Sequence, residues 1–158
     1  MTRKITLILI LALAGTMTAH AQDQSREHDR EHHAAHGGAE LDLTRPESGK
    51  WASDESLRQG MSELRSAFKP HHAAYKAGNF DAGQAAELAD SVEENVNFMF
   101  ANCRLPADAD AELHKLLAAA LGAAQSLRDS DDPHEGLHQL HQVLKAYPEF
   151  FDHPGWRG

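Results

Sequence analysis

The chain of 158 residues contains a single cysteine, Cys103. The pattern of the first 21 residues predicts that the protein is exported. A lone thiol in an exported protein has no partner for an internal disulfide. A thiolate, two imidazoles and a weak axial thioether form the ligand set of cupredoxin-like, mononuclear electron-transfer copper sites. The residue types therefore predict a copper centre. Its predicted ligands are Cys103, His114, His153 and Met61, with Met99 as the alternative thioether.

Histidine also occurs in two groups that could form secondary metal sites of the nitrogen type. The first group places four imidazoles within a short N-terminal tract, namely His28, His32, His33 and His36. The second group falls on expected helices, namely His71, His72, His134 and His138, with His141 next in line. Neutral imidazole is a good ligand for copper, zinc and nickel. A polar surface whose histidines bind nothing is the alternative interpretation of both groups.

The first 21 residues have the pattern of a secretory signal peptide. Arg3 and Lys4 precede an apolar run over residues 5–14, and Ala19-His20-Ala21 is a small-x-small cleavage site. The run is too short to span a bilayer. We therefore expect cleavage after residue 21, a mature chain that starts at Gln22, no membrane attachment after cleavage, and a periplasmic location.

The net charge of the chain disfavours some classes of binding partner. The formal net charge is −9, and losing Arg3 and Lys4 leaves the mature chain at −11. Such an acidic chain is a poor partner for nucleic acid or an anionic membrane surface. Residues 22–50 contain few large apolar side chains, so we expect a disordered, His-rich leader.

The copper ligands must be positioned by four expected helices, which begin at about Ser53, Asp81, Asp108 and Pro133. Asp81 and Gln84 form a capping-box pattern, and Pro70 is expected to kink or end the first helix. Apolar residues recur at helical spacing in four stripes. The stripes are Leu57, Met61, Leu64, Phe68, His71 and Tyr75; Leu88, Val92, Val96, Met99 and Cys103; Leu113, Leu117, Ala120, Ala124 and Leu127; and Leu137, Leu140, Leu144, Tyr147 and Phe151.

Short links between these helices predict an all-α, up-down-up-down four-helix bundle over residues 51–156. Alternating helix directions bring all five candidate copper ligands into one half of the bundle, and the helical histidines of the second group into the other. Met61 and His114 lie roughly 10 Å inside their helix starts, at about 1.5 Å of rise per residue. A single site therefore needs the helices to be offset, or the C-terminal turn to fold inward.

Several segments resemble the small periplasmic proteins often labelled DnrO-like, which are associated with bacterial copper-handling systems. The segments are Trp51-Ala52-Ser53-Asp54, Arg58-Gln59-Gly60-Met61, Asn102-Cys103-Arg104-Leu105, Ala107-Asp108-Ala109-Asp110-Ala111-Glu112-Leu113-His114 and Phe151-Asp152-His153-Pro154-Gly155-Trp156. The resemblance covers about residues 50–156. It implies a periplasmic role connected with copper.

The expected bundle also resembles the soluble periplasmic b-type cytochromes. That resemblance implies haem b ligated by Met61 early in the first helix and by His153 late in the fourth. Cys103 and His114 have no role in such a site, and the chain lacks a Cys-x-x-Cys-His for covalent haem attachment.

The sequence thus favours an exported copper-binding protein that acts in electron transfer or copper homeostasis, with a redox or copper-trafficking protein as its partner. No nucleophile–base pair or carboxylate pair stands out, so we do not expect an enzyme. Three alternatives stay open: a b-type haem protein for electron transfer, a Cu(I) chaperone or buffer, and a metal-free helical partner module.

Overall fold

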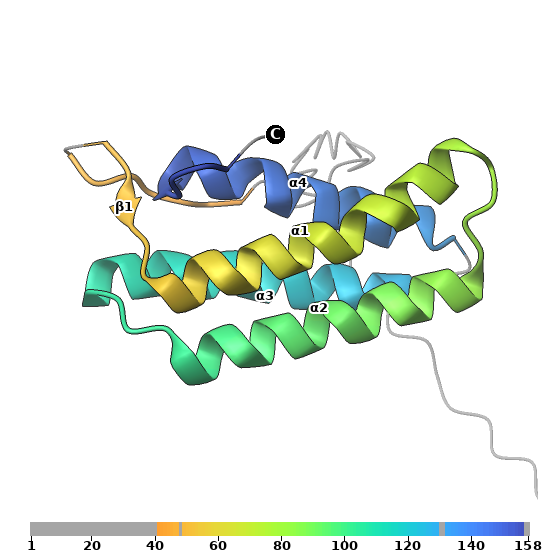
Figure 1. The fold of residues 1–158 in the computed structure, drawn as a ribbon, viewed down its shortest axis with the longest axis horizontal. Helices are drawn as coiled ribbons and strands as arrows, with labels where there is room; N and C mark the ends of the chain where they lie inside the picture. Colours follow the sequence, from red (N-terminus) through yellow and green to blue (C-terminus); the bar gives the residue numbers. More distant parts are fainter. Residues whose placement is uncertain (1–40, 48, 130–131, 157–158) are drawn as a thin grey trace, which may run out of the picture. The chain divides into compact units, whose positions relative to one another are not determined.

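The computed structural model describes residues 41–47, 49–129 and 132–156, and these form a four-helix bundle (Figure 1). The helices are α1 (Glu55–Lys76), α2 (Ala82–Asn102), α3 (Ala107–Asp129) and α4 (His134–Phe150). Each helix packs against the next one along the chain. The predicted all-α, up-down-up-down bundle is confirmed.

The helix starts follow local capping chemistry. At α2 the Asp81 carboxylate accepts from the Gln84 N–H at 2.9 Å, and the Gln84 side chain accepts from the Asp81 N–H at 3.2 Å, which is the predicted capping box. The start of α1 differs from the prediction by one residue. Asp54, and not Ser53, is the N-cap, and its carboxylate accepts from the Leu57 N–H at 2.7 Å.

Two prolines lie inside helices. Pro70 was expected to kink or end the first helix, but α1 continues beyond it to Lys76. Pro70 is exposed, so water can hydrate the backbone carbonyl that loses its partner. Pro148 lies near the end of α4, which stops two residues later at Phe150.

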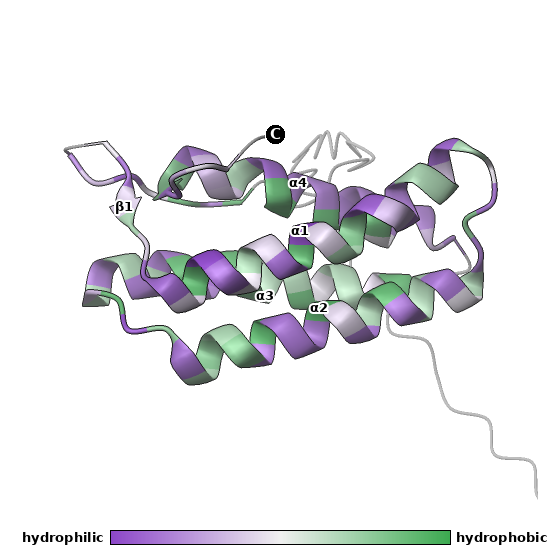
Figure 2. Ribbon diagram, viewed as in Figure 1, coloured by the Kyte–Doolittle hydropathy of each residue, from purple (hydrophilic) through white to green (hydrophobic). Residues whose placement is uncertain are grey.

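The core is made by the apolar stripes that the sequence predicts, and Figure 2 shows hydrophilic and hydrophobic residues alternating along every helix. The stripe of α1 is shorter than predicted. It is buried from Leu57 to Phe68, whereas His71 is only half-buried and Tyr75 is 42% exposed. The far end of α1 therefore presents imidazole and phenol rings at the surface.

A short strand pair, which the sequence analysis did not expect, joins the first and last elements. β1 (Trp51–Ala52) pairs in parallel with β2 (Phe151–Asp152). The Ser53 hydroxyl adds a hydrogen bond to the Asp152 carbonyl. Two residues per strand are too few to show an alternating pattern, because periodicity needs a longer window.

The boundary of the expected leader is also corrected. Residues 41–47 were assigned to the disordered leader, but they lie against the bundle. The Thr44 N–H donates to the buried Glu112 carboxylate at 2.7 Å, and Leu41 and Leu43 pack against the core. The Trp51 indole donates to the Thr44 carbonyl at 2.7 Å. The expected signal peptide and residues 22–40, including the four leader histidines, lie outside the described residues.

Candidate functional site

The predicted grouping of helix ends is present. The Arg104 N–H, just after α2, donates to the Asp54 carboxylate at 2.5 Å, so the start of α1 meets the end of α2. The β1–β2 pair holds the end of α4 at the same place. One half of the bundle therefore contains the start of α1, the link between α2 and α3, and the end of α4.

Cys103 lies at this end of the bundle as the C-cap of α2, and it is half-buried. Burial, the nearby carboxylates of Asp54 and Asp110, and a hydrogen bond to Asp54 together raise the pKa of the Cys103 thiol to about 12. The thiol is therefore protonated at neutral pH. Metals bind the thiolate, so a metal at this position has to displace the proton.

His153 lies on the C-terminal turn and is held by aromatic neighbours. Its Nδ1 lies 3.0 Å from the hydroxyl of the buried Tyr147, and its ring centroid lies 5.1 Å from that of Trp156. Burial lowers the pKa of His153, and the positive charges of Arg58 and Arg65 lower it further. The imidazole is thus neutral, but two cations near it oppose the arrival of a metal ion.

His114 lies on the surface of α3. Its Nδ1 lies 2.8 Å from the Asp110 carbonyl oxygen, and its ring packs against Phe100 of α2 at a centroid distance of 5.1 Å. Phe100 is itself 43% exposed. His114 therefore belongs to the outer α2–α3 surface, while the two methionines lie in the interior.

Met61 and Met99 are both 0% exposed. Met99 lies against Gly60, where a Cβ atom would come within 2.8 Å of the Met99 sulfur. Both thioethers are thus packed as core side chains, as methionines often are.

The predicted copper ligands therefore share one half of the bundle but make separate contacts. Among the described residues, no group of three or more His, Cys, Asp or Glu is placed to hold a metal ion. The residues do not fit a four-ligand copper centre as they stand. A haem ligated by Met61 and His153 has the same difficulty, because the Met61 side chain is fully buried among core side chains.

Three histidines of the other half also have partners. His71 Nδ1 lies 2.8 Å from the Ala67 carbonyl oxygen, His134 Nδ1 lies 2.9 Å from a carboxylate oxygen of Asp132, and His138 Nε2 lies 3.2 Å from the Gln142 side-chain nitrogen. In the part of the chain that the structure describes, His72 and His141 are the two histidines whose ring nitrogens have no hydrogen-bond partner.

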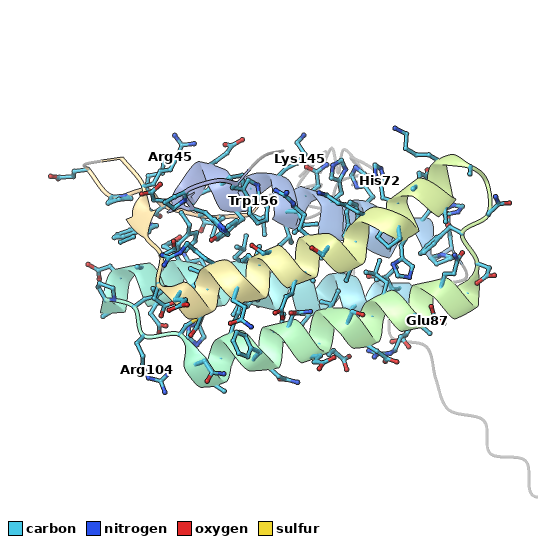
Figure 3. All side chains as sticks on the ribbon, viewed as in Figure 1. Arg45, His72, Glu87, Arg104, Lys145 and Trp156 are labelled. Carbon is cyan, nitrogen blue, oxygen red and sulfur yellow. The ribbon has the colours of Figure 1, made fainter. Side chains whose placement is uncertain are left out.

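His72 of α1 and His141 of α4 face each other where the two helices meet (Figure 3 labels His72). Their ring centroids are 5.1 Å apart, and both rings stack on Phe68, at 5.1 and 5.5 Å. Two histidines bound to one ion at about 2.0–2.1 Å have ring centroids roughly 4.5 Å apart in square-planar geometry and roughly 5 Å apart in tetrahedral geometry. The pair is thus spaced as two ligands of one ion.

Burial and nearby charges keep the His141 imidazole in the form that binds metals. Burial lowers the pKa of His141, and His72, Lys145 and His138 lower it further through their charges. Neutral imidazole is the ligand form. The sequence indicated His72 and His141 as separate histidines and not as a pair, because packing determines which faces of two helices distant in sequence meet. The i, i+4 spacing of Phe68 and His72 was the available signal.

A groove adjoins the pair along the line where α1 and α4 face each other, which we call the α1–α4 seam. These two helices pack less closely than sequential helices do. The groove has a volume of about 320 Å³. Its lining residues are Arg65, Phe68, Lys69, His141, Leu144, Lys145, Pro148 and Trp156.

No protein-family model, curated protein or solved structure significantly matches the chain. Among the described residues, no helix combines the length and the apolar character that crossing a membrane requires.

Proposed function

We propose that this protein is an exported copper-binding protein of metal homeostasis, and that His72 and His141 hold the ion. The pairing of the two rings across the α1–α4 seam carries the proposal. The rings come from different helices, their centroids are 5.1 Å apart, and Phe68 supports both. Packing thus fixes the spacing before an ion arrives, which lowers the ordering cost of binding.

Copper is the favoured ion because, among divalent first-row metals, it binds nitrogen ligands most tightly. The resemblance of residues 50–156 to copper-associated periplasmic proteins agrees with this choice. With two ligands from the protein, the remaining coordination positions of the copper ion are open to water or to an exchanging ligand. Such a site suits capture and release of copper better than electron transfer, for which the ligands are held by the protein throughout the redox cycle.

The predicted Cys103 centre is the second candidate, and one observation favours it. The Tyr147 hydroxyl is 3.0 Å from His153 Nδ1, and Cys103 packs against the core cluster that contains Tyr147. Burial raises the pKa of Tyr147, and a negative charge on Cys103 would raise it further. Two of the predicted ligands therefore flank one side chain. Copper binding there requires the Cys103 thiol to lose its proton, while His153 can bind through Nε2 and keep its Nδ1 contact with Tyr147.

Calorimetric titration with Cu(II) tests the proposal. The mature chain should carry His28, His32, His33 and His36 as Ala, so that the leader adds no binding. We expect His72→Phe with His141→Phe to weaken binding at least tenfold, because Phe keeps the stacking on Phe68 but donates no nitrogen. The matched control, His114→Phe with His138→Phe, removes two surface imidazoles and should bind as the parent does.

A visible spectrum from the same titration separates the two candidates. A copper thiolate absorbs strongly in the visible, whereas a nitrogen-only site absorbs weakly. We expect weak absorption that Cys103→Ser leaves unchanged. Strong absorption that Cys103→Ser abolishes would instead assign the copper to the Cys103 centre.

A further inference from the structure

The groove in the α1–α4 seam combines apolar walls with a cationic rim. Its walls are Phe68 from α1, Leu144 and Pro148 from α4, and Trp156 from the C-terminal turn. This combination is that of a small-molecule site, in which apolar side chains supply contact and a few polar groups set orientation.

Three cations line the groove, namely Arg65, Lys69 and Lys145, and no Asp or Glu is among the described residues that line it. The rest of the protein has the opposite character, since the formal net charge of the whole chain is −9. A cluster of cations on an acidic protein attracts an anion locally. Figure 3 shows Lys145 and Trp156 on the same side of the bundle as His72.

Side-chain contacts define both ends of the groove. At one end Trp156 packs on Tyr147 at a ring-centroid distance of 4.9 Å, and the Arg65 guanidinium lies 4.5 Å from the Trp156 ring centroid. At the other end the stacked rings of Phe68 and His141 join the helices. The space between therefore does not depend on one mobile side chain.

The volume limits the size of the occupant. The groove measures about 320 Å³, at the lower end of the range for ligand sites. Because a water-sized group takes about 30 Å³ in a liquid, the space suits roughly ten non-hydrogen atoms. A folded peptide segment or a haem is too large for it.

We infer that this groove binds a small anionic amphiphile, namely a medium-chain monocarboxylate. The alkyl chain lies against Phe68, Leu144 and Trp156, and the carboxylate lies between Lys69 and Lys145. The inference uses the groove and its cations and does not depend on copper binding at His72 and His141.

Octanoate tests the inference, with 1-octanol as the matched uncharged probe. Trp51→Phe leaves Trp156 as the single tryptophan of the chain, so its fluorescence reports on the groove, and calorimetry gives the affinity. EDTA is present throughout, so that the result is independent of the copper proposal. We expect octanoate to bind with a change in Trp156 fluorescence, and octanol to bind at least several-fold more weakly.

Lys69→Gln with Lys145→Gln keeps most of each alkyl stem but removes both charges. It should weaken octanoate binding by roughly two- to fivefold per lysine and leave octanol unaffected. Lys50→Gln with Lys76→Gln removes the same charge from exposed positions outside the groove and should have little effect. Equal binding of octanoate and octanol, or equal losses in the two lysine pairs, would overturn the inference.

Discussion

At the scale of single residues, Asp54 connects three parts of the bundle through one carboxylate. It caps α1 by accepting from the Leu57 N–H, it accepts from the Arg104 N–H after α2, and it bonds to the Cys103 thiol. The thiol is therefore held as a hydrogen-bond donor in a half-buried position. This explains how the protein tolerates a free cysteine, because a thiol kept protonated reacts slowly.

Cys103 should be alkylated slowly by iodoacetamide near pH 8, because burial and Asp54 raise the pKa of its thiol to about 12. The rate should rise steeply as the pH approaches that value. Asp54→Asn removes the negative charge and keeps an N-cap, so the thiol pKa should fall and alkylation should be faster. Because the amide nitrogen cannot accept from the Arg104 N–H, the free energy of unfolding should also fall by about 1 kcal/mol. Equal pH–rate profiles for the two proteins would show that Asp54 does not act on the thiol.

Glu112 provides a second prediction at this scale. Burial alone would raise the pKa of its carboxyl, but hydrogen bonds from Lys115 and from the Thr44 N–H outweigh burial and lower the pKa below the usual 4.5. A lowered pKa stabilises the fold above the unfolded-state value, and this contribution is lost as the pH falls through the folded-state value. Urea unfolding between pH 7 and pH 3 should show a shallower loss of stability for Glu112→Gln than for the parent. An unchanged slope would contradict the account.

At the scale of helices, the approach of α1 to α2 depends on Gly60. A Cβ atom there would lie 2.8 Å from the sulfur of Met99, which is 0% exposed and cannot move into solvent. Gly122 of α3 offers a contrast, because a Cβ atom there would meet nothing within 4 Å. The two helical glycines should therefore respond in opposite ways to the same added methyl group.

Gly60→Ala should lower the free energy of unfolding by about 1–3 kcal/mol, as overpacking of a core does. Gly122→Ala should raise it by about 0.5–1 kcal/mol, because alanine loses less backbone entropy in a helix. Urea denaturation of both variants measures the difference. If Gly60→Ala is as stable as the parent, Met99 does not pack against that position as described.

The sequence predicted the helices well, because their signals are local. The stripe from Leu137 to Phe151 is buried, and the Asp81–Gln84 capping box is present. The same reasoning located the half of the bundle that contains Cys103, but not the orientation of its side chains. His114 faces outward, and the His72–His141 pair depends on how α1 and α4 are rotated toward each other. Periodicity within one helix does not determine that rotation.

At the scale of the whole molecule, the folded unit extends beyond the helices on the N-terminal side. Arg45 lies over the Phe150 ring at 5.0 Å from its centroid, and its guanidinium is 3.3 Å from the Glu149 carboxylate. Lys115 donates to the Asp42 carbonyl at 3.0 Å. The segment of residues 41–47 thus bridges α3 and the end of α4.

Two truncations test this extension. A chain that starts at Leu41 keeps the segment, whereas one that starts at Ser48 loses it, along with the half-buried Leu41 and Leu43. We expect the shorter chain to be less stable than the longer one by about 1–3 kcal/mol, because apolar area returns to water. Thermal unfolding followed by circular dichroism measures the difference. Equal midpoints would show that residues 41–47 do not stabilise the bundle.

The central claim is that copper binds between α1 and α4, at His72 and His141. Electron paramagnetic resonance of one equivalent of Cu(II) tests it most directly, in the mature chain whose leader histidines are Ala. We expect nitrogen couplings from two imidazoles, which disappear in His72→Phe with His141→Phe and persist in Cys103→Ser. A spectrum that survives the loss of both histidines, or that changes when Cys103 is replaced, would contradict it.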